Sequence, residues 1–168
     1  MTLNIKDIDA FIFDFDGVLT DNKVFVNEDG SESVICSRSD GLAFDVLRKI
    51  KKKFFILSTE TNQVVTKRGE KIQAHVIQSS TNKLESVRLI AKKYKLSLDK
   101  LCFIGNDIND LEAMNICGVS VCPNDSHNLI KKCAQIILKR NGGDGVVREL
   151  IEEVFQLDFL NILYKSKI

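Results

Sequence analysis

The chain has 168 residues, 44% of them hydrophobic, and its 24 Lys and Arg residues nearly balance its 23 Asp and Glu residues, for a formal net charge of +1. This length predicts a single domain over residues 1–168. The neutral balance gives no general attraction to nucleic acid, and the lysine clusters Lys51–Lys53 and Lys92–Lys93 fit solvated helix ends. No apolar run reaches the ~18 residues of a membrane span, so we expect no membrane partner.

The cysteine pattern indicates the redox environment. The five cysteines, at positions 36, 102, 117, 122 and 133, are odd in number and form no Cys-x-x-Cys pair. Most lie in or beside apolar segments, which favours reduced core thiols over a disulfide framework or a zinc site. We therefore expect a cytoplasmic protein.

Short apolar runs alternate with amphipathic stretches, a pattern typical of parallel strands joined by crossover helices. The predicted strands, in chain order, are Ala10–Phe15, Phe54–Leu57, His75–Gln78, Leu101–Ile104, Val119–Cys122 and Gln135–Leu138. Apolar residues recur at helical spacing within 42–50 and 84–94, where Asp40 and Thr81 are the expected N-caps. The pattern predicts a three-layer, Rossmann-like α/β fold with a parallel sheet.

Two segments depart from this alternation. Strand-like runs at Lys23–Asn27 and Glu32–Ser37 flank a turn that ends in Gly30, which predicts a β-hairpin inserted at about 22–37, after the first strand. An isolated hairpin needs a partner, either the body of the domain or another subunit. The apolar tail, at about 156–168, fits either a docking segment or a helix folded on its own subunit.

In open α/β sheets, ligands bind at the carboxyl ends of the strands. The residues that follow the predicted strands, or begin the next helix, are Asp14, Asp16, Ser58, Thr59, Glu60, Lys83 and Gly105–Asp110. Carboxylates, hydroxyls and an ammonium group should therefore converge at one edge of the sheet.

Asp14 and Asp16 point to the same side of an extended chain because they are two residues apart. Two such carboxylates repel each other unless a cation or a shared proton intervenes. Mg²⁺ often binds one or two carboxylates together with a substrate phosphate. The alternative is a solvated carboxylate pair in a loop.

Ser58 and Lys83 complete the pattern because they follow successive predicted strands. Taken alone, Ser58 fits a helix cap and Lys83 fits a solvated lysine. Ser58 offers a hydroxyl to a phosphoryl oxygen, and Lys83 offers positive charge. No Walker A loop or Gly-x-Gly-x-x-Gly fingerprint is present. His75 and His127 lack partners at metal-ligand spacing, which favours structural or surface roles for both.

These residues resemble the four motifs of the haloacid dehalogenase (HAD) superfamily: Asp14-Phe-Asp-Gly-Val-Leu-Thr-Asp21, Ser58, Lys83 and Gly105-Asn-Asp-Ile-Asn-Asp110. The inserted hairpin, the lack of a cap domain and the segment Asn141-Gly-Gly-Asp-Gly-Val-Val-Arg-Glu149 are similar to the subfamily of 3-deoxy-octulosonate (KDO) 8-phosphate phosphatases. That subfamily includes nonulosonate 9-phosphate phosphatases.

The resemblance implies a Mg²⁺-dependent phosphomonoesterase in which Asp14 attacks phosphorus and forms an aspartyl-phosphate. Asp16 is then the general acid and base, and Ser58 and Lys83 hold the phosphoryl group. The implied metal ligands are Asp14, the Asp16 carbonyl and the fourth motif, with Asn106, Asp107 and Asp110 as candidates. The usual family pattern has Asp in place of Asn106, and the amide supplies an oxygen without a charge.

The residues after Ser58 bear on the substrate. KDO 8-phosphate phosphatases, which this chain resembles, typically have Thr-Gly-Arg at this point, whereas this chain has Ser58-Thr-Glu60. Glu60 favours sugar hydroxyls over a carboxylate. The nonulosonate-type phosphatases are similar to this chain in having Glu here and Arg and Lys further along the next helix. The resemblance implies Arg68 and Lys71 as candidates for the sugar-acid carboxylate, with solvated helix charges as the alternative. We therefore favour a nine-carbon 2-keto-3-deoxy acid 9-phosphate, such as a KDN or N-acylneuraminate 9-phosphate, over KDO 8-phosphate.

The resemblance also implies a homotetramer, in which the hairpins pack together and a neighbour's surface or C-terminal tail closes the site. Two other interpretations remain open. One is a non-catalytic oligomerisation domain like those attached to some acylneuraminate cytidylyltransferases. The other is a phospho-receiver, which needs an Asp after the third strand, where Gln78–Ser80 offers none.

Overall fold

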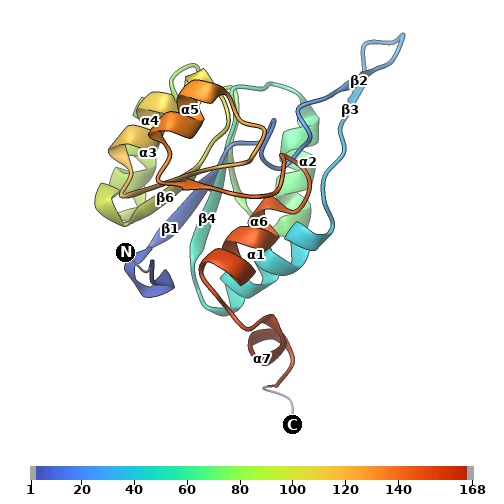
Figure 1. Ribbon diagram of the computed structural model, residues 1–168. Coiled ribbons are helices and arrows are strands. Elements are labelled where there is room, and N and C mark those ends of the chain that lie inside the picture. Colours follow the sequence, from blue (N-terminus) through green and yellow to red (C-terminus); the bar gives the residue numbers. More distant parts are fainter. Residues whose placement is uncertain (1–2, 166–168) are drawn as a thin grey trace.

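The computed structural model describes residues 3–165, and a parallel six-stranded sheet forms its centre (Figure 1). The strand order is β5-β4-β1-β6-β7-β8, with every pair parallel. The strands are β1 (Ala10–Phe13), β4 (Lys53–Leu57), β5 (His75–Ile77), β6 (Leu101–Ile104), β7 (Val119–Cys122) and β8 (Ile136–Ile137). All six lie within a residue or two of the predicted runs, and the predicted fold class is confirmed.

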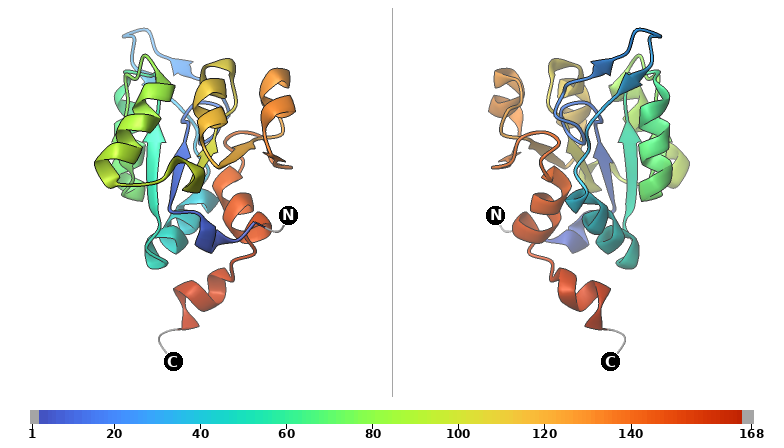
Figure 2. Two further views of the ribbon diagram at one scale, coloured as in Figure 1. Left: turned by 90° about the vertical axis from the view of Figure 1, so that its left-hand side faces the viewer. Right: turned by 90° about the vertical axis from the view of Figure 1, so that its right-hand side faces the viewer.

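Helices cover both faces of the sheet (Figures 1 and 2). One face carries α1 (Ser39–Lys49), α2 (Gln63–Ile72) and α6 (Val146–Glu149), which continues into a π-helical segment, Leu150–Val154. The other face carries α3 (Lys83–Tyr94), α4 (Leu111–Ile116) and α5 (Asn128–Cys133). Single 3₁₀ turns lie at Ile5–Asp7, Leu98–Lys100 and Ile108–Asp110. The predicted three layers are therefore present.

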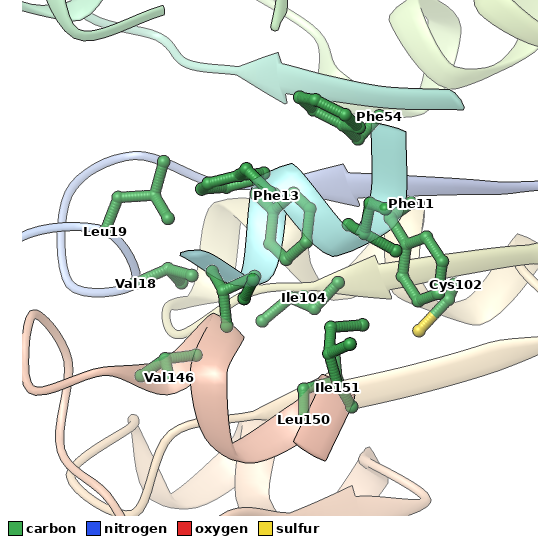
Figure 3. Packing of buried hydrophobic residues seen from close by; sticks show 14 of the residues in the cluster. Phe11, Phe13, Val18, Leu19, Phe54, Cys102, Ile104, Val146, Leu150 and Ile151 are labelled. Carbon is green, nitrogen blue, oxygen red and sulfur yellow. The ribbon is translucent and has the colours of Figure 1, made fainter. Parts of the chain in front are cut away.

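Alternate strand residues supply the two cores, as the period of two in a strand requires. Phe11 and Phe13 of β1 pack towards α1 and α6, whereas Ala10 and Ile12 pack towards α3 and α4. Figure 3 shows the first core, in which the β1 phenylalanines lie among β6, α6 and the turn after β1. Val18 of that turn is fully buried there, so the turn that follows Asp14 and Asp16 is fixed to the core.

Both predicted helix caps are wrong. Asn82, rather than Thr81, caps α3 by accepting the N–H of Glu85 at 3.1 Å. Asp40 lies inside the first turn of α1, and its carboxylate accepts the N–H of Arg148 at 2.9 Å. Asp40 therefore satisfies a backbone group at the start of another helix, 108 residues further along the chain.

The inserted hairpin is present, but its two strands pair only over β2 (Phe25–Val26) and β3 (Glu32–Ser33). It projects from one end of the molecule, opposite α7 (Phe159–Leu163) (Figures 1 and 2). The side chains of Val24, Phe25, Val26 and Ile35 are 49–65% exposed. An exposed apolar patch of this kind is typical of an interaction surface.

The described part of the C-terminal tail folds onto its own subunit, where α7 packs against α1. Phe159 is buried, and the Arg148 guanidinium lies 4.3 Å from the centre of its ring. Residues 166–168 of the tail lie outside the described residues. Among residues 3–165, no helix combines the length and hydropathy that a membrane crossing requires.

The cysteines are unpaired, in agreement with the sequence-based interpretation. Cys102, Cys117 and Cys122 are buried, Cys36 is partly buried and Cys133 is exposed. Burial raises the pKa of the Cys102 thiol well above its ordinary value. A buried thiol of this kind is unreactive and serves packing.

Candidate active site

The polar residues after β1, β4 and β6 meet at the carboxyl edge of the sheet, around a cavity of about 320 Å³. Its lining residues are Asp14, Asp16, Asn22, Thr59, Asn106, Asp107, Ile108 and Asn109. The sequence did not single out Asn22, and it indicated Ile108 and Asn109 only as members of the segment Gly105–Asp110. Asn22 has a left-handed backbone (φ 62°) in the turn that follows β1. The polar run Thr-Asp-Asn of that turn is the sequence feature that could have indicated this residue.

Lys83 forms ion pairs with two carboxylates beneath the cavity. Its Nζ lies 2.8 Å from Asp14 Oδ1 and 2.6 Å from Asp110 Oδ1, and all three side chains are at most 7% exposed. Ion pairs shielded from water in this way hold a fixed geometry, because breaking one leaves an uncompensated buried charge. The first turn of α3, the end of β1 and the loop after β6 are therefore held together.

Asp110 organises the loop that carries the fourth motif. Its Oδ2 accepts the N–H groups of Asn106 at 2.9 Å and Asp107 at 3.2 Å, while Oδ1 faces Lys83. A Cβ on Gly105 would lie 2.6–2.8 Å from the Asp110 side chain, so only glycine allows this approach. The structure therefore places Asp110 as the anchor of the loop, outside the lining of the cavity.

The Asn106 side chain reaches back to β1. One end of its amide lies 3.0 Å from the Asp16 carbonyl oxygen and 3.1 Å from Asp14 Oδ2. With the nitrogen there, the amide donates to both oxygens. With the oxygen there, an amide, a carbonyl and a carboxylate oxygen converge, and these are the donors that a hard cation such as Mg²⁺ prefers.

Gly17 makes room for this convergence. Its backbone is left-handed (φ 79°), and a Cβ there would lie 1.9 Å from the Asn106 amide nitrogen. The described residues contain no cluster of three His, Cys, Asp or Glu side chains at metal-binding distance. The candidate cation site instead combines one carboxylate with two neutral oxygens.

The buried charges do not cancel. Burial and, after it, the Asp110 carboxylate raise the pKa of Asp14 to about 8, although the Lys83 ammonium opposes the shift. Burial lowers the pKa of Lys83, but Asp14 and Asp110 together hold it above its ordinary value. With both carboxylates ionised, one ammonium leaves one negative charge in excess, which either a proton on Asp14 or a bound cation would balance.

Asp16 is half-buried and lines the cavity. Its Oδ1 accepts the hydroxyl of Thr20 at 3.4 Å. Burial raises the pKa of Asp16, and the carboxylates of Glu60 and Glu32 raise it further, whereas the Thr20 hydroxyl opposes the shift. A carboxyl group with a raised pKa is suited to carry a proton near neutral pH.

Ser58 and Thr59 lie differently, although they are adjacent. Ser58 is buried, and its Oγ accepts the N–H of Glu60 at 3.0 Å. Thr59 is exposed and lines the cavity. Asp107 also lines it, and its Oδ1 accepts the N–H of Ile108 at 2.7 Å.

A second pocket of about 270 Å³ adjoins the first and shares Asp16, Asn22 and Thr59 with it. Its remaining lining residues are Glu60 in the loop before α2, Val64 in the first turn of α2, and Lys23, Val24, Glu32 and Val34 of the hairpin. The hairpin is held there by a hydrogen bond of 2.9 Å from Asn62 Nδ2 to Glu32 Oε2. The hairpin therefore forms one wall of the approach to Asp16.

Arg68 and Lys71 lie elsewhere. They line a separate pocket of about 290 Å³ between α1 and α2, together with Arg38 and Arg48. Arg68 donates to the Ser37 carbonyl oxygen at 2.7 Å. Within one subunit, neither lines the two pockets that contain Asp16.

The two histidines have structural roles, in agreement with the sequence-based interpretation. His127 caps α5, where its Nδ1 accepts the N–H of Leu129 at 3.2 Å. The ring of His75 stacks on Phe55 at 5.3 Å.

Comparison with known proteins identifies the family. A family model described as haloacid dehalogenase-like hydrolase matches residues 18–150. The KDO 8-phosphate phosphatase KdsC of Escherichia coli K12, in full 3-deoxy-D-manno-octulosonate 8-phosphate phosphatase, is 26% identical over 148 residues, which cover 88% of this chain and 79% of that protein.

Two solved structures have the same fold. A HAD family hydrolase from Streptomyces avermitilis has a TM-score of 0.88 at 33% identity, over 90% of this chain and 87% of that one. The KDO 8-phosphate phosphatase of Moraxella catarrhalis, in complex with a magnesium ion, a phosphate ion and KDO, has a TM-score of 0.86 at 27% identity, over 90% and 88% of the two chains.

The chain therefore belongs to the haloacid dehalogenase-like hydrolases. The resemblance read from the sequence is confirmed, as is the prediction of an enzyme of the phosphomonoesterase class.

The raised pKa of Asp14 predicts an unusual dependence of stability on pH. In the unfolded chain, Asp14 loses its proton near pH 4, whereas in the folded chain it keeps the proton up to about pH 8. Folding stability from this group is therefore lost as pH rises between these values. Without divalent cations, Asp14→Asn should raise the free energy of unfolding relative to the parent at pH 8, and the gain should vanish towards pH 4.

Urea unfolding of both proteins in a chelating buffer measures this difference. Glu112→Gln, which removes an exposed carboxylate on α4, is the control and should show no such trend. An Asp14→Asn variant that is less stable than the parent at pH 8 would contradict the charge excess derived for the site.

Proposed function

We propose that this protein is a Mg²⁺-dependent phosphatase that hydrolyses the phosphomonoester of a 2-keto-3-deoxy sugar acid through an aspartyl-phosphate. The observation that carries the proposal is the convergence of Asp14, the Asp16 carbonyl and Asn106 above the buried Lys83. The relatives support the substrate class, since KdsC is a KDO 8-phosphate phosphatase.

The nucleophile in this proposal is the Asp14 carboxylate. Its Oδ1 is held by Lys83 at 2.8 Å and by the N–H of Phe15 at 2.7 Å, while Oδ2 faces Asn106. The carboxylate needs no base, provided that it is ionised. Mg²⁺ held by Asp14, the Asp16 carbonyl and Asn106 would supply positive charge that favours the ionised form and binds a phosphoryl oxygen.

Asp16 serves as general acid and then as general base. It donates its proton to the leaving sugar oxygen when Asp14 attacks phosphorus, and it later takes a proton from the water that hydrolyses the aspartyl-phosphate. Its raised pKa favours the protonated form that the first step requires. The Thr20 hydroxyl orients the carboxyl group.

Lys83 balances the charge that develops on the phosphoryl oxygens. Thr59 lines the cavity and offers a hydroxyl to the same oxygens, whereas the Ser58 hydroxyl shapes the loop through the Glu60 amide. Asp107 remains a candidate for a water-mediated contact to the cation, and Asp110 holds the loop.

The leaving sugar would occupy the second pocket, between the hairpin and Glu60. Carboxylates of Asp16, Glu32 and Glu60 surround this pocket, with Lys23 as its one basic lining residue. Such a lining accepts hydroxyl donors and repels a carboxylate close to the phosphate. A nine-carbon acid 9-phosphate fits this pattern because its carboxylate lies at the far end of the molecule.

The carboxylate of that substrate would then be bound by Arg68 and Lys71. Since both line a separate pocket of their own subunit, they would act from a neighbouring subunit. The exposed apolar hairpin supplies a surface for such an assembly, and we propose a homotetramer. The presence of Asp14, Asp16 and Lys83 disfavours the non-catalytic alternative, and so do the shared cavity of the two aspartates and the ion pair between Asp14 and Lys83.

The proposed mechanism predicts that Asp14→Asn lowers Mg²⁺-dependent phosphate release by roughly 10³-fold or more, because an amide is a poor nucleophile. Release is measured with KDO 8-phosphate, KDN 9-phosphate and N-acetylneuraminate 9-phosphate. The control is Glu112→Gln, which should retain the parent rate. Turnover by Asp14→Asn within tenfold of the parent, or a parent inactive on all three compounds, would overturn the proposal.

The choice of substrate depends on Glu60. We expect the parent to prefer a nine-carbon 9-phosphate to KDO 8-phosphate, and Glu60→Arg to shift the ratio of kcat/KM values towards KDO 8-phosphate by about tenfold. Glu60→Gln, which removes the charge without reversing it, should give an intermediate ratio. A parent that prefers KDO 8-phosphate, or a ratio that is the same in all three proteins, would refute this assignment.

A further inference from the structure

The loop between β8 and α6, at residues 141–145, lies directly against the turn that follows Asp16. Gly143 donates its N–H to the Val18 carbonyl oxygen at 3.0 Å. A Cβ on Gly142 would lie 2.2 Å from the Gly17 carbonyl oxygen, and one on Gly143 would lie 2.5 Å from the Asp21 nitrogen. The two backbones therefore touch, and side chains at these glycines would separate them.

The contacted turn, Gly17–Asp21, controls the Asp16 side chain through Thr20. The Thr20 hydroxyl is fully buried, accepts the N–H of Gly17 at 3.2 Å and donates to Asp16 Oδ1 at 3.4 Å. A displacement of the turn would therefore move the group that orients the Asp16 carboxyl.

The loop is fixed at both ends by buried carboxylates. Before it, Glu149 accepts the N–H groups of Lys139 at 2.7 Å and Arg140 at 2.9 Å. After it, Asp40 accepts the N–H of Arg148 at 2.9 Å. Both carboxylates are at most 3% exposed, and backbone groups that lose such partners inside a protein are costly.

A third support comes from the turn after β7. Asp125 Oδ1 accepts the N–H of Gly142 at 2.9 Å. In the same turn, the N–H of His127 donates to the Asn106 carbonyl oxygen at 2.9 Å. The loop is thus connected to both motifs that face the cavity, although none of its own residues lines it.

We propose that the Asn141–Gly145 loop is a positioning element for Asp16, with Asp40 and Glu149 as its anchors. The inference rests on the proposed function, in which Asp16 is the general acid. It assigns a task to the Gly-Gly-Asp-Gly segment, which takes no part in the chemistry itself. The loop contacts the turn and holds it in place, the turn fixes Thr20, and Thr20 orients the proton of Asp16 towards the leaving oxygen.

The test compares two aryl phosphates of similar shape, p-nitrophenyl phosphate and phenyl phosphate, at saturating Mg²⁺. The first has a good leaving group that needs little help from an acid, whereas the second depends on it. A misplaced Asp16 therefore slows phenyl phosphate more than p-nitrophenyl phosphate. General structural damage lowers both rates by the same factor.

Gly143→Ala should raise the ratio of p-nitrophenyl to phenyl kcat/KM values, which report the step in which the leaving group departs, by about tenfold, a fraction of the full effect of a general acid. Gly30→Ala is the matched control: Gly30 also has a left-handed backbone (φ 79°, against 74° for Gly143), but a Cβ there meets nothing within 4 Å. Its ratio should equal that of the parent. The two variants share backbone strain and differ in contact with the turn.

A second pair of variants tests the anchor in case Gly143→Ala does not fold. Asp40→Ala removes the acceptor of the Arg148 N–H and should raise the ratio, whereas Asp40→Asn keeps an oxygen acceptor and should restore the parent ratio. Hydrogen exchange should be faster in Gly17–Asp21 for Asp40→Ala alone. Exchange at the parent rate in this segment would also contradict the proposal.

Asp16→Asn distinguishes a failure of the proposed function from a failure of the positioning inference. If it does not raise the ratio, Asp16 is not the general acid and the proposed function fails. If it does, while Gly143→Ala or Asp40→Ala slows both substrates equally, the positioning inference is overturned and the proposed function stands.

Discussion

The ammonium of Lys83, held between the carboxylates of Asp14 and Asp110, is the interaction on which the site depends. It joins three parts of the chain that meet only after folding: the end of β1, the first turn of α3 and the loop after β6. Removing the Lys83 ammonium would leave both carboxylates buried without compensation, and breaking a buried ion pair in this way typically costs about 3–5 kcal/mol. The position of the Asp14 carboxylate is therefore enforced by the stability of the fold itself.

The same interaction sets the electrostatics of the cavity. Both carboxylate oxygens of Asp110 accept hydrogen bonds, one from Lys83 and the other from the loop backbone. Asp14 instead has one oxygen, Oδ2, beside Asn106. The negative charge of the ionised carboxylates and the three converging oxygens suit a small divalent cation, which in the proposed function prepares the cavity for a phosphate dianion. Asn106 contributes no charge, so this site has one fewer carboxylate than the usual family pattern.

Much of this was predictable because parallel strands end at a common edge. The strand pattern and the places of Asp14, Asp16 and Lys83 follow from local periodicity and from that rule. The Asp40 cap was mispredicted because the partner of Asp40 lies 108 residues away, which no local pattern encodes, whereas the cap of α3 is Asn82, one residue after the predicted Thr81. The burial of Ser58, and the separate pocket that holds Arg68 and Lys71, depend on how loops and helices pack, and residue spacing does not reveal this.

Titration of the metal-free protein with Mg²⁺ in a calorimeter tests the central claim most directly. The account predicts one Mg²⁺ per chain, binding about tenfold tighter in Asn106→Asp, where a carboxylate replaces the amide, and greatly weakened in Asp14→Asn. Mg²⁺ binding of the same affinity in the parent and in both variants would place the cation elsewhere and contradict the account.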